Sequence, residues 1–487
     1  MASISQHLDG LNSVGTWAYS SVVLSMLWVV YCLLSSHLRW IPGPWYNRLT
    51  NLVLTFHTLR GRRIFYVDGL HKKYGPVVRI SYSEVDVADV KGFKTIHKIG
   101  NGFLKHKWYK DFTKSPVEDV FSTLNPKIHA SRRRVLNPAL SPAALRTNWE
   151  WLVQDKIQKA VANLKQDALA GTGDAYKWLN LASSDVVGHI ATGNDFGLTE
   201  AGEKTGFFED LEILNIINVV RSVLGPAWPL ARRFVRSFQD MADAEVRIHT
   251  YCAGVVRDIR ERKGSKANVF TALIQEESAD TDATTAFEVL GLILAGAGTT
   301  AITLAYLIWA VLKNPEVQQK LEDEVAQLEE GYNTARLKEL PYLKAVIQES
   351  LRLYTAIPGG LQRVVPQSAP LQAAGHTIPP GSTVVTQAYT VHRNADLWPS
   401  PETFDPDRFL EANLKPEQKT ALFPYGAGSR ICLGMHLADV MMLHAVAGLF
   451  RSCKGLKLAE TMSDSDMDFF NMFVIVPKGQ KCEVMLR

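Results

Sequence analysis

The sequence has few cysteines, and none lies in a pattern that marks a disulfide framework or a metal cluster. It contains five cysteines in 487 residues, an odd number, and no Cys-x-x-Cys pair. Disulfide-stapled secreted proteins and structural zinc sites need paired or closely spaced cysteines. The chain also has no Asn-x-Ser/Thr glycosylation acceptor. These absences argue against a disulfide framework, a zinc module and secretion of the main body.

A strong charge bias and a nucleotide-binding loop are missing as well. The formal net charge is +4, and the basic run Arg132–Arg134 is short and has no aromatic residues interleaved. Nucleic-acid-binding proteins usually show a longer basic patch, so we predict no nucleic-acid partner. The sequence has no internal repeat, no low-complexity tract and no phosphate-cradling glycine loop, and flavin and nicotinamide modules are therefore not expected. Electrons for any redox reaction would have to come from another protein.

No Lys or Arg precedes residues 14–34, a mostly apolar run without charge that is long enough to cross a bilayer. A cleaved signal peptide and a buried core helix are the alternatives, but a signal peptide needs a basic start. We predict a single-pass anchor within residues 1–38, followed by a stiff hinge at Ile41–Pro44. Arginines gather after the run, which places the main body in the cytosol by the positive-inside rule. These residues are Arg39, Arg48, Arg60, Arg62 and Arg63.

A second run, residues 289–312, also lacks charge, and hydropathy alone would make it another transmembrane span. A non-catalytic two-span membrane protein is therefore an alternative. The centre of the run, residues 295–300, reads Ala-Gly-Ala-Gly-Thr-Thr. Each mid-helix glycine disfavours the helix by roughly 1 kcal/mol relative to alanine. Because small residues also occur where membrane helices pack together, the composition leaves both interpretations open.

The most informative stretch is residues 423–434, which holds Cys432 in a glycine-rich loop before a predicted helix over 433–450. A helix N-terminus and the nearby Arg430 both favour a thiolate over a thiol. Glycines permit backbone angles closed to other residues and let the main chain approach a bulky ligand. The three glycines of this loop are Gly426, Gly428 and Gly434.

This loop resembles the haem-ligand loop of the cytochrome P-450 superfamily, in which Phe, Gly, Arg, Cys and Gly occupy fixed positions. Gly428, Arg430, Cys432 and Gly434 fill four of them, and Tyr425 stands in place of the Phe. The resemblance implies a mainly α fold with small β-sheets, in which residues 39–487 form a haem-thiolate catalytic domain. It also implies that Cys432 is the axial ligand of the haem iron. The phenol of Tyr425 then needs a hydrogen-bond partner.

The centre of the second apolar run resembles the oxygen-activating segment of the same family. By this resemblance Thr299, followed by Thr300, organises hydrogen bonds on the oxygen side of the haem, and Ala295 borders the substrate pocket. Gly298 departs from the pattern, because the family usually has Asp or Glu there as part of the proton route. Water can fill the gap, the substrate's own hydroxyl or amine can relay the proton, or the enzyme can run a different chemistry such as isomerisation or dehydration.

Other blocks extend the resemblance over most of the chain. In the family, residues at the positions of His129, Arg133, Arg363 and Arg430 bind the haem propionates. A Glu-Arg-Arg network also stabilises the haem-side core. Its counterparts here are Glu349, Arg352 and Arg408. The pocket residues that the resemblance implies, besides Ala295, are Ile357, Leu361, Phe470 and Phe473.

Together these features predict a haem monooxygenase that inserts one oxygen atom from O2 into an apolar small molecule. The implied cofactor is heme b, and NADPH would act only through a membrane-bound NADPH–cytochrome P-450 reductase. The predicted location is the endoplasmic reticulum membrane, and the style of the sequence is that of fungal secondary metabolism. A haem-thiolate isomerase or dehydratase and the two-span membrane protein are the alternatives.

Overall fold

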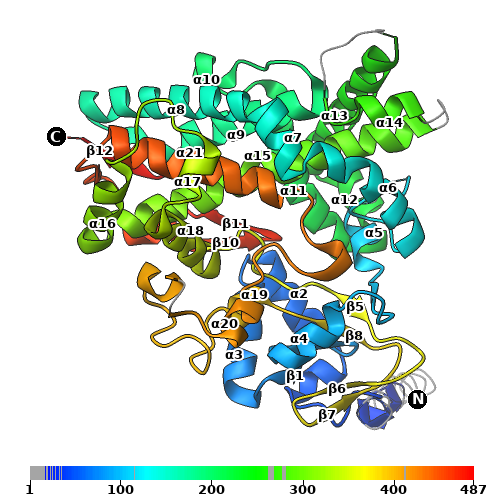
Figure 1. Cartoon of the computed structure of the whole chain (residues 1–487). Coiled ribbons are helices and arrows are strands. Elements are labelled where there is room, and N and C mark those ends of the chain that lie inside the picture. The colour runs from blue at the N-terminus through cyan, green and yellow to red at the C-terminus, as the bar shows by residue number, and fades with distance from the viewer. Residues whose placement is uncertain are drawn as a thin grey trace, which may run out of the picture.

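The computed structural model of the chain describes residues 36–113, 116–261, 268–276, 281–410 and 413–486, with isolated residues between 17 and 33 (Figure 1). The isolated residues are helical. Most of the predicted anchor region, residues 1–38, lies outside the described residues, so the anchor stays a prediction.

Helices make up most of the described chain. The N-terminal and central ones are α2 (Leu52–Leu59), α3 (Arg63–Tyr74), α4 (Val90–His97), α5 (Trp108–Thr113), α6 (Pro126–Ala139), α7 (Pro142–Ala144), α8 (Glu150–Ala170), α9 (Ala175–Thr192), α10 (Leu198–Ala201), α11 (Gly206–Leu224) and α12 (Trp228–Phe234). The later ones are α13 (Arg236–Glu261), α14 (Thr271–Glu276), α15 (Asp282–Leu312), α16 (Pro315–Val325), α17 (Thr334–Leu337), α18 (Pro341–Leu353), α19 (Ala388–Val391), α20 (Pro416–Ala421) and α21 (Met435–Ser452).

The strands are short and form small sheets. They are β1 (Val77–Arg79), β2 (Glu84–Val87), β3 (Leu104–Lys105), β4 (Gly173–Asp174), β5 (Arg363–Val364), β6 (Leu371–Ala373), β7 (His376–Ile378), β8 (Thr383–Val385), β9 (Lys457–Leu458), β10 (Phe469–Met472), β11 (Val474–Pro477) and β12 (Glu483–Met485). The largest sheet has the order β1-β2-β8-β5-β3, and only its β2–β8 pair is parallel. Figure 1 shows this sheet beside α2–α4, below the larger helical part. A mainly α fold with small sheets is thus confirmed.

The second apolar run is the core of α15. Among the described helices α15 alone is long and apolar enough to cross a membrane, yet 61% of its most apolar window is buried inside the protein. It packs along α9. Gly296 permits the close approach, because a Cβ at this position would lie 2.8 Å from Cγ2 of Val187. The run is apolar because it crosses the protein core, and this removes the reason for the two-span hypothesis.

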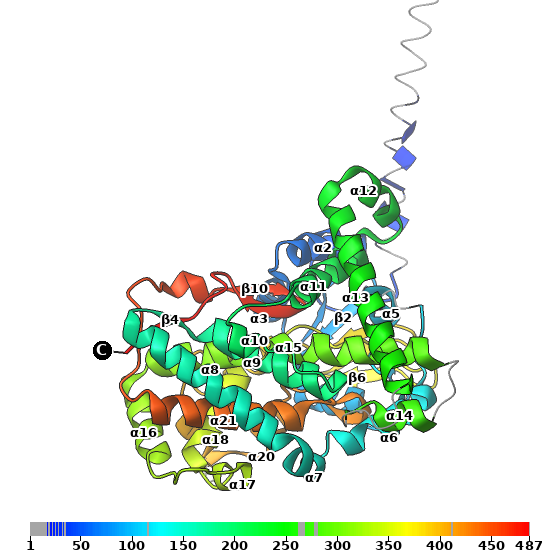
Figure 2. The same cartoon turned by 90° about the horizontal axis from the view of Figure 1, so that it is seen from above.

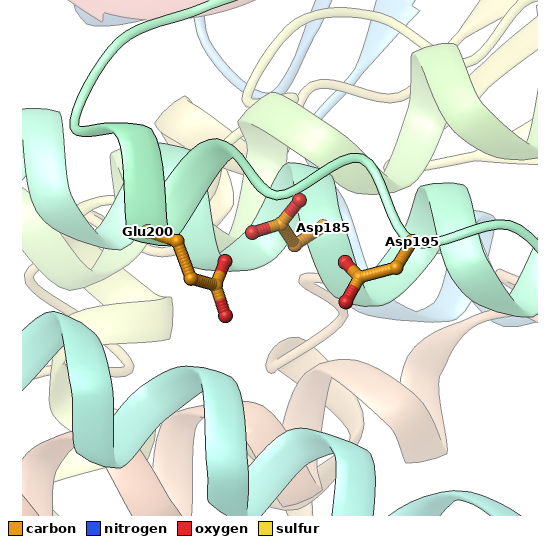
Figure 3. Close-up of side chains that lie close together, drawn as sticks. All are labelled: Asp185, Asp195 and Glu200. Carbon is orange, nitrogen blue, oxygen red and sulfur yellow. The ribbon is translucent and has the colours of Figure 1, made fainter.

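A buried ammonium group ties α8 to α9 and to the segment that follows it. Nζ of Lys156 lies 2.9 Å from Asp195, 2.9 Å from Glu200 and 3.6 Å from Asp185. Figure 3 shows the three carboxylates turned toward one another. Burial alone would lower the pKa of Lys156, but hydrogen bonds to Asp195 and Glu200 raise it above its ordinary value. Lys156 lies among the three carboxylates, and Lys159 pairs with Glu200 as well at 2.8 Å, so we interpret this cluster as an ion-pair network and not as a metal site.

A second buried network lies beside the Cys432 loop. Glu349 accepts two hydrogen bonds from the Arg352 guanidinium, at 2.7 and 2.8 Å. Arg408, in the 3-10 helix Pro406–Phe409, donates to the same carboxylate at 3.1 Å. Arg352 also donates to the carbonyls of His392 and Pro401, both at 2.7 Å. The trio expected from the sequence therefore lies together, and its charges are paired inside the protein.

His392 joins this network to the Cys432 loop. Burial lowers the pKa of His392 to about 3, so the ring is neutral at ordinary pH. Nε2 lies 3.1 Å from the backbone N–H of Phe423 and accepts its hydrogen bond, while Nδ1 lies 3.0 Å from the carbonyl oxygen of Arg352 and donates to it. Phe423 in turn stacks on Phe93, with 3.9 Å between ring centroids. The start of the loop is thus fixed through a histidine that must stay unprotonated.

We predict that His392 makes the fold acid-sensitive. Its pKa in the folded protein lies below the ordinary 6.5, so its stabilising contribution is complete above about pH 6.5 and is lost as the pH falls toward 3. In this range the protonation of one histidine changes the free energy of unfolding by about 1.4 kcal/mol per pH unit. Urea unfolding between pH 5 and 8 should show a pH dependence that is shallower by this amount in His392→Gln. His376→Gln, which changes a half-exposed histidine, is the matched control. Equal pH dependence in wild type and His392→Gln would contradict the assignment.

Candidate functional site

The Cys432 loop is built from two left-handed glycines and one close backbone contact. Gly426 and Gly428 have φ angles of 73° and 69°. A Cβ on Gly428 would lie 2.0 Å from the carbonyl oxygen of His97, so no other residue fits there. The backbone N–H of Cys432 donates to the carbonyl of Tyr425 at 2.9 Å, which closes the loop just before α21. The glycine positions follow from the motif, whereas the contact with His97 depends on the fold.

The sulfur of Cys432 is accessible to solvent, although protein surrounds it. Burial raises the pKa of the Cys432 thiol, while a hydrogen bond from the Gly434 N–H and the charge of Arg133 act to lower it. The exposure of Cys432 and the burial that raises its pKa agree if the sulfur faces an enclosed space inside the protein. The thiolate expected from the sequence is therefore not favoured by the protein alone. A bound metal cation deprotonates a coordinating thiol outright, so this sulfur suits a metal ligand.

Basic side chains gather near this loop. Burial, together with the charges of Arg430, Lys105, Arg133 and Arg363, lowers the pKa of His129 to about 3. Lys105 and Arg363 are direct cross-strand partners of β3 and β5, an arrangement that is unfavourable for like charges. Burial also lowers the pKa of Lys105 well below its ordinary value, and Arg363 and Arg430 add to this effect.

The cluster has donors to spare for an anion. Nη1 of Arg430 is buried and has no hydrogen-bond partner. Arg363 donates to the carbonyl of Gln362 at 2.8 Å, and Lys105 donates to the carbonyl of Phe121 at 2.5 Å, so both are satisfied only by neutral oxygens. Guanidinium groups suit carboxylates, which they bind with two parallel hydrogen bonds. The residues present therefore fit a ligand with two carboxylates, as the haem propionates are.

Lys105 is a member of this cluster that the sequence did not indicate. A lone lysine in a two-residue strand carries no motif, and only the pairing of β3 with β5 brings it beside Arg363. Arg133, whose role at a propionate stays a prediction, also contacts the Cys432 loop. Its Nη1 donates to the carbonyl of Ile431 at 2.5 Å and lies 3.5 Å from that of Ser429. Arg133 thus fastens α6 to the Cys432 loop.

Tyr425 has the partner that its phenol requires. Its hydroxyl donates to Oδ1 of Asp439 in α21 at 2.8 Å. Burial raises the pKa of Tyr425 well above its ordinary value, and the neighbouring Asp439 adds to this effect. The departure from Phe is therefore accommodated by a second polar residue on the same side of the protein as Cys432.

The central segment of α15 presents one open face. Ala295 is exposed and Thr299 half-exposed, whereas Ala297 and Thr300 are buried. Residues four apart share a helix face, and the hydroxyl of Thr299 donates to the carbonyl of Ala295 at 2.7 Å. A Cβ on Gly298 would have only Cδ1 of Ile302 nearby, at 4.0 Å. The acid position of the family is thus empty space here, and α15 packs against α21, the helix that follows Cys432.

The residues expected to line the pocket do not all lie together. Leu361 lies beside the Cys432 loop, with its Cδ1 3.6 Å from a Cβ on Gly426, and Ile357 is half-exposed. Phe473 occupies the turn between β10 and β11. Phe470 lies apart from the others, because its ring covers Gly61 and the residue is 39% exposed.

Comparison with known proteins agrees with this geometry. The family model described as cytochrome P-450 matches residues 42–484. The chain is 35% identical to the cytochrome P-450 monooxygenase cypX of Dothistroma septosporum, over 96% of each chain. It is 36% identical to the monooxygenase stcB of Emericella nidulans, over 92% of this chain and 88% of that one. It is 33% identical to aflV of Aspergillus parasiticus, over 97% and 95%. The chain belongs to the cytochrome P-450 family.

Proposed function

We propose that the protein is a haem-dependent monooxygenase that inserts one oxygen atom from O2 into an apolar small molecule of fungal secondary metabolism. The observation that carries the proposal is the exposed Cys432 in a loop whose Arg430, like Lys105 and Arg363, forms no ion pair among the described residues. Cys432 would ligate the iron of heme b. The haem, once bound through a thiolate, supplies the activation of O2. The propionates would bind to His129, Lys105, Arg363 and Arg430.

The chain's own residues then shape the oxygen side of the site. Thr299 donates its hydroxyl proton to the carbonyl of Ala295, so the hydroxyl oxygen stays free to accept a hydrogen bond on the open face. Gly298 offers no proton, and its open space has room for water or for a hydroxyl or amine of the substrate. The protein itself contributes the fixed orientation of the Thr299 hydroxyl at this face.

The proposed setting is the endoplasmic reticulum membrane, with electrons supplied by NADPH–cytochrome P-450 reductase. Exposed apolar residues on α2 and around α12 support a membrane contact in addition to the predicted anchor. Figure 2 shows these two helices at the same end of the molecule. The apolar residues are Leu52, Phe56, Leu59, Leu230, Phe234 and Val235. Neighbouring arginines, Arg60, Arg62, Arg232 and Arg233, suit anionic lipid headgroups.

Replacement of the proposed ligand tests the function directly. We expect Cys432→Ala to lose the thiolate-type absorbance of the reduced carbon monoxide complex, and to lose NADPH-dependent product formation with the reductase, because the other described cysteines are buried. Cys453→Ala, which removes a buried cysteine elsewhere, should keep both. An unchanged carbon monoxide spectrum in Cys432→Ala would refute the proposal.

Gly298→Glu tests how protons arrive. The Cβ has room, and a glycine removed from a helix interior stabilises the helix, so the variant should fold. General acid–base catalysis typically contributes at least about a hundredfold to a reaction rate, so the largest gain in product formation is expected to be of this order. If water fills the gap, we expect a larger share of the NADPH consumed to appear as product and a smaller share as hydrogen peroxide. Gly298→Gln is the matched control without an acid. Equal coupling in all three proteins would show that protons bypass this position.

The same space supports a second candidate, a haem-thiolate isomerase or dehydratase that needs no proton relay. Product formation from the substrate in the absence of NADPH and reductase would favour it over the monooxygenase.

A lipid-quenching experiment tests the membrane contact. A fluorophore on Phe234→Cys, in the full chain with Cys32→Ser and reconstituted in anionic vesicles, should be quenched by brominated lipids, because this residue is 75% exposed on the proposed contact surface. The same label on Val246→Cys, which is 63% exposed on α13, should not be quenched. Equal quenching at the two positions would contradict the surface.

A further inference from the structure

Four aromatic side chains from three separate segments pack into one cluster, which we call the aromatic wall. Trp108 and Phe112 come from α5, Phe121 from the following loop and Phe473 from the β10–β11 turn. Ring centroids lie 4.8 Å apart for Trp108–Phe112, 4.9 Å for Phe112–Phe473 and 6.2 Å for Phe121–Phe473. These separations are those of favourable offset or edge-on aromatic pairs.

The wall is not ordinary core. Phe112 is buried behind it, whereas Trp108, Phe121 and Phe473 each stay half-exposed. A cluster that only filled the interior would bury all of its rings, because each exposed aromatic face forgoes hydrophobic stabilisation. Three rings that share contacts and keep part of their surface free form a surface on which a flat apolar molecule can lie.

The wall borders the candidate haem site on one side. The ammonium of Lys105 lies 4.4 Å from the ring centroid of Phe121 and 3.9 Å from that of Tyr109. The hydroxyl of Tyr109 accepts a hydrogen bond from Arg363 at 3.4 Å. Two members of the cationic cluster therefore touch the wall or its neighbour Tyr109, so the wall begins where the proposed propionate site ends.

On its other side, the loop that carries Phe121 is hydrogen-bonded to α15. The backbone N–H of Val120, the residue before Phe121, donates to the carboxylate of Glu288 at 2.8 Å. Glu288, Ala295 and Thr299 stand at i, i+7 and i+11 and so share one helix face. The loop that carries Phe121 is thus fastened to the face that carries the open Ala295 and Thr299.

Phe473 is held in a backbone conformation that side-chain-bearing residues rarely adopt, with φ of 70°. Such outliers persist only where the surroundings hold them, and they concentrate at functional sites. Here the side chain of Asn471 donates to the carbonyl of Phe473 at 3.3 Å. The backbone N–H groups of Asn471 and Ile475 donate to the carbonyls of Gly61 and Ala356, both at 2.9 Å. These hydrogen bonds hold the turn on both sides and so keep the ring of Phe473 packed against that of Phe112.

We infer that the substrate carries a planar aromatic ring system, which stacks on the free faces of Trp108, Phe121 and Phe473. This inference rests on the proposed haem monooxygenase function and names the chemical class of its substrate. A flat ring gains both hydrophobic contact and offset stacking on such a surface, whereas a saturated ring of the same carbon skeleton gains hydrophobic contact alone. The wall is therefore a specificity-determining surface.

The test compares naphthalene with decahydronaphthalene on the haem-loaded full chain. Each is titrated and its dissociation constant measured from the shift in the haem absorbance and, independently, from quenching of tryptophan fluorescence. One stacked pair contributes about 2- to 10-fold in affinity. Wild type should therefore bind naphthalene at least about 2-fold more tightly than decahydronaphthalene. Phe473→Leu and Phe121→Leu, which keep an apolar side chain, should each reduce the preference. Phe470→Leu is the matched control, because this ring lies over Gly61 on the same hairpin and should leave the preference unchanged.

Equal affinity for the two ligands in wild type would overturn the inference, and this result needs no variant to fold. An equal loss of affinity for both ligands in Phe473→Leu would also overturn it, because the ring would then supply only apolar surface. In either case a haem-loaded protein with a thiolate-type carbon monoxide spectrum would leave the proposed function standing. Failure of that spectrum in wild type would instead refute the function itself.

Discussion

The structure depends on a group of buried cations that form no ion pair among the described residues. Lys105 and Arg363 face each other across a strand pair, and Arg430 adds a third charge with a buried nitrogen that has no partner. Folding alone would disfavour this arrangement, because buried like charges repel and lose their hydration. A dianionic cofactor between them reverses the sign of the interaction. The proposed haem, bound at Cys432, would therefore also stabilise the fold.

The repulsion between these cations explains why many hydrogen bonds and ion pairs hold the segments around the Cys432 loop. The Glu349 carboxylate collects two arginines, and one of these holds backbone carbonyls from the segment that leads toward the loop. His392 passes the connection on to Phe423, and Arg133 fastens the loop from the side of α6. A thiolate ligand must keep its position through repeated catalytic cycles. The network would supply this rigidity to the proposed ligand from charged and neutral hydrogen bonds that are buried or partly buried.

Local features of the site were predictable from the sequence, and non-local ones were not. The Cys432 loop is recognisable because its glycines and its cysteine lie within a few residues and their backbone needs are local. Lys105, His392 and Asp439 were missed because each acquires its role from a partner far away in the sequence. The apolar run in α15 was ambiguous, since a helix through a protein core and a helix through a bilayer need the same composition. Only its packing against α9 distinguishes the two.

The two departures from the family pattern differ in whether another residue of the protein compensates for them. At Tyr425 the added hydroxyl is matched by Asp439, so the change is balanced within the chain. At Gly298 no such answer appears among the described residues, because the space that a side chain would enter meets only the end of Ile302. A substitution whose new polar group finds a partner within the chain can accumulate without altering the reaction. A substitution that removes a proton donor and is not compensated leaves proton delivery to a group outside the chain. The proton route is therefore the part of the mechanism in which solvent or substrate must take a share, and a substrate held flat against the aromatic wall would keep its polar groups in fixed positions relative to that space.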